Sequence, residues 1–306
     1  MKHCMDNWIS QIYPVEKTGG NRIFIMRDDL LPYSFGGNKA RKARLFFEEI
    51  DAGGYDAVVT YGSGGSNHCR VIANLAAQRN MTCVVVSADR DSDCINRRLL
   101  QQFGAQVRAC PVEQVSDTID AVLAQLRTAG RKPFFIPGGG HGNTGTRAYD
   151  LAYDEIKGFQ QRQNMAFDYI FFASGTGTTH AGLLCGKKRW GDTHTQIVGI
   201  SIARSNPRGG QVVADSVRAY AGDCPEEDLH FLDEYICGGY GKYDAFVEET
   251  IRRMMRQHGI PLDPTYTGKA YAGMLRWLKE KHISGKRILF IHTGGTPLFC
   301  DWVREQ

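Results

Sequence analysis

Short apolar runs alternate with longer amphipathic stretches along most of the chain. Apolar runs bounded by turn residues are typical of strands buried on both faces of a sheet, and the stretches between them have the length of helices. The pattern predicts strands at 22–27, 57–60, 82–86, 106–109, 133–136, 169–173, 196–201 and 287–292. It predicts helices at 39–52, 67–79, 92–103, 115–129, 145–163, 179–190, 208–221, 243–258 and 266–282.

This alternation predicts an α/β fold in two domains, each built on a mostly parallel, twisted sheet that is flanked by helices. The glycine-rich stretch 137–142 (PGGGHG) interrupts the rhythm, and we interpret it either as a hinge between domains or as a flexible turn. We expect a large domain from residues 1–50 and 145–306 and a small inserted domain from residues 51–144.

Composition and charge exclude several classes of protein. The net charge of +4, without a long basic tract, gives no reason to expect nucleic-acid binding. No apolar run reaches membrane-spanning length, and the first residues (MKHCMDNWIS) lack a signal-peptide core, so no membrane association is expected. The nine cysteines are scattered and form neither a CxxC pair nor a zinc-like cluster. They predict reduced thiols in the cytoplasm and no metal site.

The stretch 35–44 (FGGNKARKAR) places a lysine at the junction of a glycine loop and a helix. Gly36 and Gly37 allow the backbone to approach a ligand closely, and Asn38 is a candidate N-cap. Lys39 then lies in the first helical turn, where a fixed amine is suited to forming an imine with an aldehyde cofactor. The alternative is a solvated basic helix face made of Lys39, Arg41, Lys42 and Arg44.

A second loop, 174–179, lies between a predicted strand and a predicted helix and is rich in glycine and hydroxyl groups. Backbone N–H groups at a helix N-terminus bind anions, so we expect phosphate here rather than an ordinary turn. The loop lacks the lysine of a Walker motif, and His180 occupies the third glycine position of a dinucleotide fingerprint. The expected phosphate contacts are Ser174, Gly175, Thr176, Gly177, Thr178 and Thr179.

Three further loops at strand or helix ends carry polar side chains. In the stretch 61–68, Ser66 and Asn67 either cap the following helix or contact a ligand. The stretches 263–269 and 292–296 add tyrosine, histidine and threonine side chains, which are by themselves more often structural than catalytic.

Several segments together resemble the D-cysteine desulfhydrase and aminocyclopropane-carboxylate deaminase family, within the tryptophan-synthase-β-like, fold-type II pyridoxal-phosphate enzymes. The segments follow the family order over nearly the whole chain, and the FGGNK and DPxYTGK elements are specific. They are RDDLLPYSFGGNKARK (27–42), SNH (66–68), SGTGTTHAG (174–182), GGYG (238–241), DPTYTGKAYAGM (263–274) and LFIHTGG (289–295).

The resemblance implies pyridoxal 5'-phosphate in a cleft between two domains, with Lys39 as the Schiff-base lysine. It implies that Asn67 contacts the phenolic oxygen of the cofactor. Ser66 would lie near the substrate carboxylate and take part in proton transfer. Residues 175–179 would hold the phosphate. The active-site tyrosines match Tyr240 and Tyr266; Ser174 and Thr293 are further candidate cofactor contacts; His68 and His141 are candidate substrate contacts, together with Ser66 and Asn67.

One position divides the family. The deaminases have a glutamate facing the pyridine nitrogen where this chain has Thr267, as in the desulfhydrase branch. A carboxylate keeps a proton on the nitrogen and makes the ring a strong electron sink, whereas a hydroxyl does so less. We therefore expect β-elimination from a small, D-cysteine-like amino acid, giving a 2-oxo acid and ammonia. Aminocyclopropane-carboxylate deamination and β-replacement remain alternatives.

The chain also departs from the family pattern on the substrate side. Gly65 stands where glutamine is usual, and His141 and Gly142 replace serine and asparagine. These changes leave the natural amino acid open more than the cofactor. Two interpretations outside the family also stay open: a nucleotide-dependent oxidoreductase in which Lys39 has no role, and a non-catalytic protein that binds phosphate compounds. A homodimer is the expected assembly.

Overall fold

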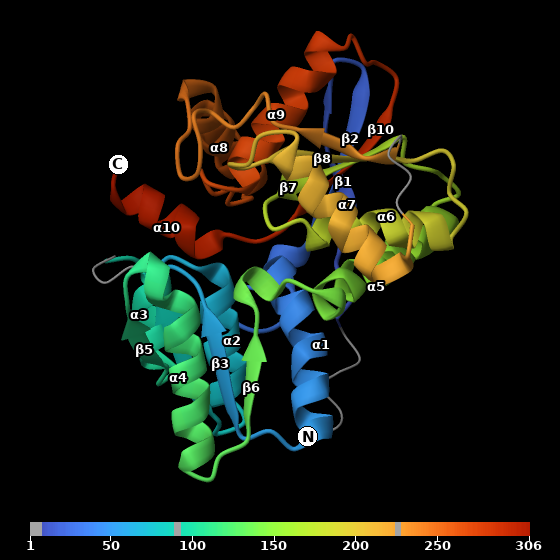
Figure 1. Ribbon diagram of the computed structural model, residues 1–306. Helices are drawn as coiled ribbons and strands as arrows, with labels where there is room; N and C mark the ends of the chain where they lie inside the picture. The colour runs from blue at the N-terminus through green and yellow to red at the C-terminus, as the bar shows by residue number, and fades with distance from the viewer. Residues whose placement is uncertain (1–7, 89–92, 224–227) are drawn as a thin grey trace.

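The protein has two sheets, each flanked by helices, and the computed structural model describes residues 8–88, 93–223 and 228–306. A six-stranded sheet has the order β1-β2-β10-β7-β8-β9, and a four-stranded sheet has the order β5-β4-β3-β6 (Figure 1). The strands are β1 Ile12–Thr18, β2 Asn21–Arg27, β3 Ala57–Tyr61, β4 Thr82–Ser87, β5 Gln106–Ala109, β6 Pro133–Ile136, β7 Tyr169–Ser174, β8 Gln196–Ser201, β9 His230–Leu232 and β10 Arg287–His292.

The α-helices fall between the strands, as the sequence pattern predicts. They are α1 Gly37–Gly53, α2 Asn67–Ala77, α3 Ile95–Gln102, α4 Val115–Thr128, α5 Asn143–Arg162, α6 Thr178–Arg189, α7 Arg208–Ala221, α8 Ala245–His258, α9 Thr267–Glu280 and α10 Thr296–Arg304. Short 3-10 helices are η2 Asp28–Leu30, η3 Val112–Gln114 and η4 Gly138–Gly140.

The strands pair in parallel except at one edge. β10 lies between β2 and β7, so that Ile288 is opposite both Ile23 and Tyr169. The pair β1–β2 is antiparallel, with a register shift between Pro14 and Glu16. An antiparallel edge strand on an otherwise parallel sheet is common in such folds.

Both faces of each sheet are buried, because successive strand residues pack into different cores. On β2, Ile23 and Ile25 belong to one hydrophobic cluster, whereas Phe24 and Met26 belong to the cluster on the opposite face. The small sheet repeats the arrangement on β3, where Val58 and the adjacent Val59 lie in different clusters. Helices therefore cover each sheet on both sides, which explains the continuous apolar runs.

The α/β fold with mostly parallel sheets is confirmed, and every predicted strand is present. The helix expected from residue 92 begins at Ile95 in the described part, and its expected start lies outside the described residues, as do residues 1–7. β1, β9 and α10 were not predicted. β1 contains Pro14 and is half-buried, β9 has three residues, and α10 lies beyond the last predicted strand. None of the three has the continuous apolar run that identified the inner strands. The exact domain boundaries stay a prediction.

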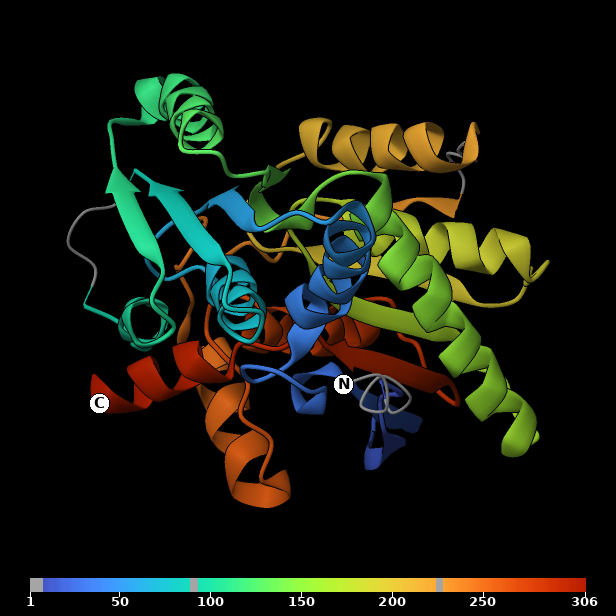
Figure 2. The same cartoon turned by 90° about the horizontal axis from the view of Figure 1, so that it is seen from below.

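Two helices connect the halves of the molecule. Helix α1 belongs to the covering of the small sheet but also packs along α5 of the large half (Figure 2). The C-terminal helix α10 leaves β10 of the large sheet and lies against α3 of the small half, where Asp301 accepts the backbone N–H of Ile95. Within the described residues, no helix combines the length and apolarity that crossing a membrane requires.

Candidate active site

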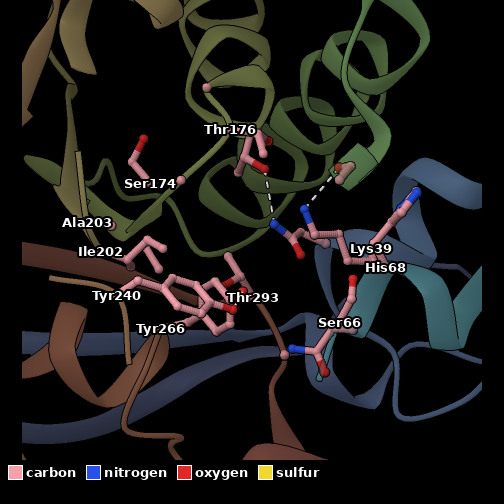
Figure 3. Close-up of a pocket in the computed structure, with 18 of the residues that line it drawn as sticks. Lys39, Ser66, His68, Ser174, Thr176, Ile202, Ala203, Tyr240, Tyr266 and Thr293 are labelled. Atoms are coloured by element: carbon pink, nitrogen blue, oxygen red, sulfur yellow. Dashed lines mark hydrogen bonds between the residues drawn. The ribbon is translucent and has the colours of Figure 1, made fainter. Parts of the chain in front are cut away.

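A cavity of about 310 Å³ lies between the two halves of the molecule, at the carboxyl ends of the parallel strands. This is the usual place for ligands in open α/β sheets. Residues from both halves line it, with Ser66 and Lys39 facing the two tyrosines and Thr293 across the space (Figure 3). The lining residues are Asn38, Lys39, Ser66, Asn67, His68, Gly139, Ala173, Ser174, Gly175, Thr176, Gly177, Thr179, Ile202, Ala203, Arg204, Tyr240, Tyr266, Thr293 and Gly294.

Lys39 lies in the first turn of α1 and is partly buried. Its Nζ donates a hydrogen bond to the carbonyl oxygen of Gly139 at 2.9 Å. Burial disfavours the ammonium form and lowers the pKa of Lys39 to about 8. An amine with this pKa is partly neutral near pH 7.5, so it is a competent nucleophile and base.

The glycines before Lys39 bring two loops into contact. At Gly37, where φ is +85°, an added Cβ would lie 2.7 Å from the carbonyl oxygen of Thr293. At Gly294, an added Cβ would lie 2.8 Å from the Cα of Gly37. The helix begins at Gly37, so Asn38 is not its N-cap; its side chain instead donates to Thr179 Oγ1 at 3.3 Å.

The interpretation of this helix as a solvated basic face is wrong. Arg41 is buried and pairs with Asp28 and Glu155. Lys42 is also buried, and its Nζ donates to Thr178 Oγ1 at 2.8 Å. Burial, reinforced by the nearby Lys39, holds the pKa of Lys42 well below its ordinary value.

The loop 174–179 forms one wall of the cavity and leads into α6. Gly177 precedes the helix with φ of +95°, so backbone N–H groups of the first turn are available to an anion. The hydroxyl of Ser174 is buried and has no hydrogen-bond partner among the described residues. Arg204, which follows β8, donates to the carbonyl oxygen of Gly175. A buried unpartnered hydroxyl beside free helix N–H groups is the environment that a bound phosphate requires.

On the opposite wall, Ser66 is both helix cap and cavity residue. Its Oγ accepts the backbone N–H of Cys69 at 3.3 Å. His68 is buried, and its Nε2 lies 2.9 Å from Thr60 Oγ1. Burial and the charges of Lys39 and Lys42 hold the pKa of His68 well below its usual value, so the ring is neutral at pH 7.

Tyr240 and Tyr266 form a hydrogen-bonded pair at the cavity. Their hydroxyl oxygens are 2.8 Å apart, and their rings meet edge to face with centroids 6.0 Å apart. Burial and the neighbouring Tyr240 raise the pKa of Tyr266 well above its ordinary value. Both phenols are therefore protonated at neutral pH, and they can donate or relay a proton.

The structure does not bring three of the expected residues to the cavity. Thr267 is fully buried, and its hydroxyl donates to Asp263 Oδ2 at 2.8 Å while accepting the Asp263 N–H. Thr178 is engaged by Lys42, and His141 lines a neighbouring hollow instead. The other expected site residues all line the cavity, and their roles toward a ligand stay predictions.

Several cavity residues were missed from the sequence. Gly139 belongs to the stretch 137–142, which connects β6 of the small sheet to α5 of the large half, and its carbonyl oxygen accepts the hydrogen bond of Lys39. Residues 202–204 directly follow β8, and their position after a parallel strand is the signal that would have found them. The contact of Lys42 with Thr178 joins segments far apart in the chain and left no local signal.

Comparison with known proteins identifies the family of this cavity. A family model described as pyridoxal-phosphate dependent enzyme matches residues 10–294. The chain belongs to this family. It is therefore a pyridoxal-phosphate enzyme, and the interpretations as a nucleotide-dependent oxidoreductase or a non-catalytic binding protein are overturned.

Individual relatives agree with this assignment. The chain is 32% identical over 290 residues to a D-cysteine desulfhydrase of Salmonella paratyphi A, covering 91% of this chain and 88% of the relative. It is 33% identical over 294 residues, with the same coverage, to a D-cysteine desulfhydrase of Serratia proteamaculans. A solved structure of an ACC deaminase homologue matches with a TM-score of 0.87 and 31% identity, covering 97% of this chain and 94% of that one. An O-ureido-L-serine synthase structure, at 18% identity and a TM-score of 0.67, shares the fold.

The residues present fit pyridoxal phosphate. The Ser174 hydroxyl, which has no partner among the described residues, and the N-terminus of α6 could hold the phosphate group, and Lys39 supplies an amine with a lowered pKa in the same cavity. The cavity volume of about 310 Å³ is at the lower end of small-ligand pockets.

Proposed function

We propose that this enzyme catalyses β-elimination from a small amino acid of the D-cysteine type, giving a 2-oxo acid, ammonia and the leaving group. The observation that carries the proposal is the convergence of the Lys39 amine, the loop 174–179 and the Tyr240–Tyr266 pair on one cavity. The relatives named D-cysteine desulfhydrase, at about one-third identity over most of the chain, support the substrate type.

We assign the binding roles as follows. The N–H groups of the loop 174–179 and the Ser174 hydroxyl hold the phosphate, and Asn38 steadies this loop through Thr179. Asn67 donates to an oxygen of the cofactor, and Ser66 to the substrate carboxylate. Thr293 lines the cavity, whereas the Thr267 hydroxyl is committed to Asp263. We therefore propose that the hydroxyl of Thr293, and not that of Thr267, contacts the pyridine nitrogen of the cofactor.

Proton transfer falls to Lys39 and the tyrosine pair. Bound pyridoxal phosphate supplies the electron withdrawal that makes the α-proton of the amino acid removable. Lys39, with its pKa of about 8, takes that proton as a neutral amine. Tyr266 and Tyr240 stay protonated and give a proton to the departing thiol. No carboxylate lines the cavity among the described residues, which favours substrates with a good leaving group at the β-carbon.

Two variants test the lysine. Lys39→Ala should abolish the visible absorption of bound cofactor and all turnover while the fold is retained by circular dichroism. Lys188→Ala is the matched control, because Lys188 is half-exposed and its ion-pair partner among the described residues is the exposed Asp223. Lys42 is unsuitable as a control because it is buried against the phosphate loop. Retention of the absorption by Lys39→Ala would contradict the assignment.

A keto-acid assay decides the reaction. D-cysteine and β-chloro-D-alanine should give pyruvate, and aminocyclopropane carboxylate should give little 2-oxobutanoate. The structure of an ACC deaminase homologue makes ring opening the second candidate. Faster turnover of the cyclopropane substrate would establish that second candidate and overturn the first.

We also propose that the two sheets mark two domains, with residues 51–144 inserted into a domain formed by 1–50 and 145–306. The proposed assembly is a homodimer in the cytoplasm. Its support is the family resemblance and the exposed apolar side chains of Ile9, Leu30 and Phe35. Light scattering during gel filtration tests the assembly, and a monomer mass at micromolar concentration would contradict it.

A further inference from the structure

A buried arginine stands behind the cavity wall. Arg70 lies on α2, three residues after Asn67, and is 1% exposed. Its Nη1 donates to Asn67 Oδ1 at 2.6 Å and to Asn96 Oδ1 at 2.7 Å, and its Nε donates to Ser34 Oγ at 3.1 Å. Burial lowers the pKa of Arg70 to about 9, and no acid in the described parts of the chain offsets that effect. Its neighbours are neutral groups, which is an unusual setting for a buried cation.

These contacts determine which way the Asn67 amide faces. Its Oδ1 accepts from Arg70 and also from Asn96 Nδ2 at 3.0 Å, so both lone pairs are used. The reverse orientation would set the amide NH₂ against a guanidinium, donor against donor. Asn67 lines the cavity, and the group that it offers there is its NH₂. A group bound at Asn67 must therefore be a hydrogen-bond acceptor.

The same guanidinium also holds the loop that leads to Lys39. Tyr33, Ser34 and Phe35 have φ of +71°, +48° and +63°, a conformation that non-glycine residues rarely adopt. Arg70 contacts two of them, through the hydrogen bond to Ser34 and by lying 5.8 Å from the centroid of the Phe35 ring. Helix α1, which carries Lys39, begins two residues later at Gly37. Successive strained residues persist only when their surroundings fix them.

We propose that Arg70 is a positioning residue that ties the Lys39 loop to Asn67 and presents the Asn67 NH₂, backed by a positive charge, to an anionic oxygen in the cavity. Two sources share this chemistry: the phenolic oxygen of pyridoxal phosphate and the carboxylate of the amino acid. Only the identity of that oxygen rests on the proposed function. The hydrogen bonds that join Arg70 to Asn67, Asn96 and Ser34 are independent of it.

The test replaces Arg70 with methionine, which keeps most of the volume and removes the charge and every donor. Arg98→Met is the matched control, because Arg98 lies on α3 beside this region, is 62% exposed at its side chain and pairs with the exposed Asp93. Titration of each apoprotein with pyridoxal phosphate gives the Kd. Absorption of the bound cofactor against pH gives a titration midpoint, steady-state kinetics gives KM, and calorimetry gives the apoprotein Tm.

A phenolic oxygen at Asn67 predicts that Arg70→Met raises the cofactor Kd tenfold or more. It also predicts a titration midpoint about one pH unit higher, because losing the cation disfavours the oxygen anion. A substrate carboxylate there predicts instead a tenfold rise in KM at unchanged cofactor Kd. Arg70→Lys, which keeps the charge, should recover part of either change, and Arg98→Met should behave as wild type.

Unchanged Kd, midpoint and KM in a folded Arg70→Met protein would overturn the proposal, whether or not the apoprotein Tm falls. If Arg70→Met does not fold, Asn96→Ala takes its place, because it removes one of the two donors to Asn67 and leaves Arg70 intact. The cofactor Kd, the titration midpoint and KM of Asn96→Ala then test whether the orientation of Asn67 matters for binding. If the wild-type apoprotein itself fails to bind pyridoxal phosphate, the proposed function fails as well. If wild type binds and the variant matches it in Kd, midpoint and KM, only the role of Arg70 is refuted.

Discussion

The lowered pKa of Lys39 predicts how the apoprotein captures its cofactor as pH changes. Only the neutral amine attacks an aldehyde, so the capture rate follows the deprotonated fraction. With a pKa of about 8, roughly a quarter of Lys39 is neutral at pH 7.5. An ordinary lysine with a pKa of 10.5 is neutral at about one part in a thousand at that pH. Burial should therefore speed capture at pH 7.5 by roughly two hundredfold through the neutral fraction alone.

Stopped-flow absorbance after mixing apoprotein with pyridoxal phosphate measures this rate. The buffers must contain no primary amine. N-acetyl-lysine, studied over the same pH range, corrects for ionisation of the cofactor itself. The corrected rate should rise with pH and level off above a midpoint near 8. A rate that keeps rising tenfold per pH unit up to pH 10 would refute the inference that burial suppresses the charge of Lys39.

Two substitutions probe the phosphate site. Gly177→Val should raise the cofactor Kd tenfold or more, because φ is +95° and the new Cβ would lie 3.0 Å from Val212 Cγ1. Gly191→Val is the control, because Gly191 also has a positive φ, +59°, but has open space around it. Equal Kd values for the two variants would show that the phosphate binds elsewhere. Lys42→Met should raise the Kd severalfold, the effect of losing a hydrogen bond worth about 1 kcal/mol, because the Thr178 hydroxyl loses this partner. Fluorescence titration of the apoproteins measures both, and an unchanged Kd in Lys42→Met would make that contact irrelevant to the cofactor.

The fold was largely predictable because its strands are inner strands. A strand buried on both faces needs an unbroken apolar run, and residues 169–173 and 287–292 have one. An edge strand such as β1 is only partly buried, so it needs no unbroken apolar run, and Pro14 further weakens the sequence signal for a strand. The site loops were predictable for a related reason. In a parallel sheet every loop that follows a strand lies at the same edge. The polar residues at 61–68, 174–179 and 292–296 are therefore expected to lie close together if those edges of the two sheets are adjacent.

Side-chain direction was not predictable from the sequence. Thr267 follows Tyr266 directly, yet Tyr266 lines the cavity while Thr267 points to the buried carboxylate of Asp263. The Asp263 carboxylate also accepts the N–H groups of Thr265, Tyr266 and Thr267, the last being the first residue of α9. The N–H groups at a helix start have no partner within the helix, so Asp263 satisfies donors that would otherwise be unpaired. Thr267, which the sequence placed at the pyridine nitrogen, therefore has a structural role at the start of α9, and we propose Thr293 for that place instead.

Side-chain direction also separates the two lysines of α1, which have the same residue type but different surroundings. Lys39 and Lys42 are three residues apart on neighbouring positions of one helix face. Burial lowers the pKa of both amines, but their partners differ. Lys39 donates to the carbonyl oxygen of Gly139, and Lys42 donates to the hydroxyl of Thr178, the first residue of α6. The carbonyl of Gly139 leaves the Lys39 amine at the cavity wall, where it can reach a ligand. The Thr178 hydroxyl keeps Lys42 behind that wall, where it can only support the loop. One helical turn thus carries one amine that lines the cavity and one that does not, and we propose the reactive role for the first and a structural role for the second.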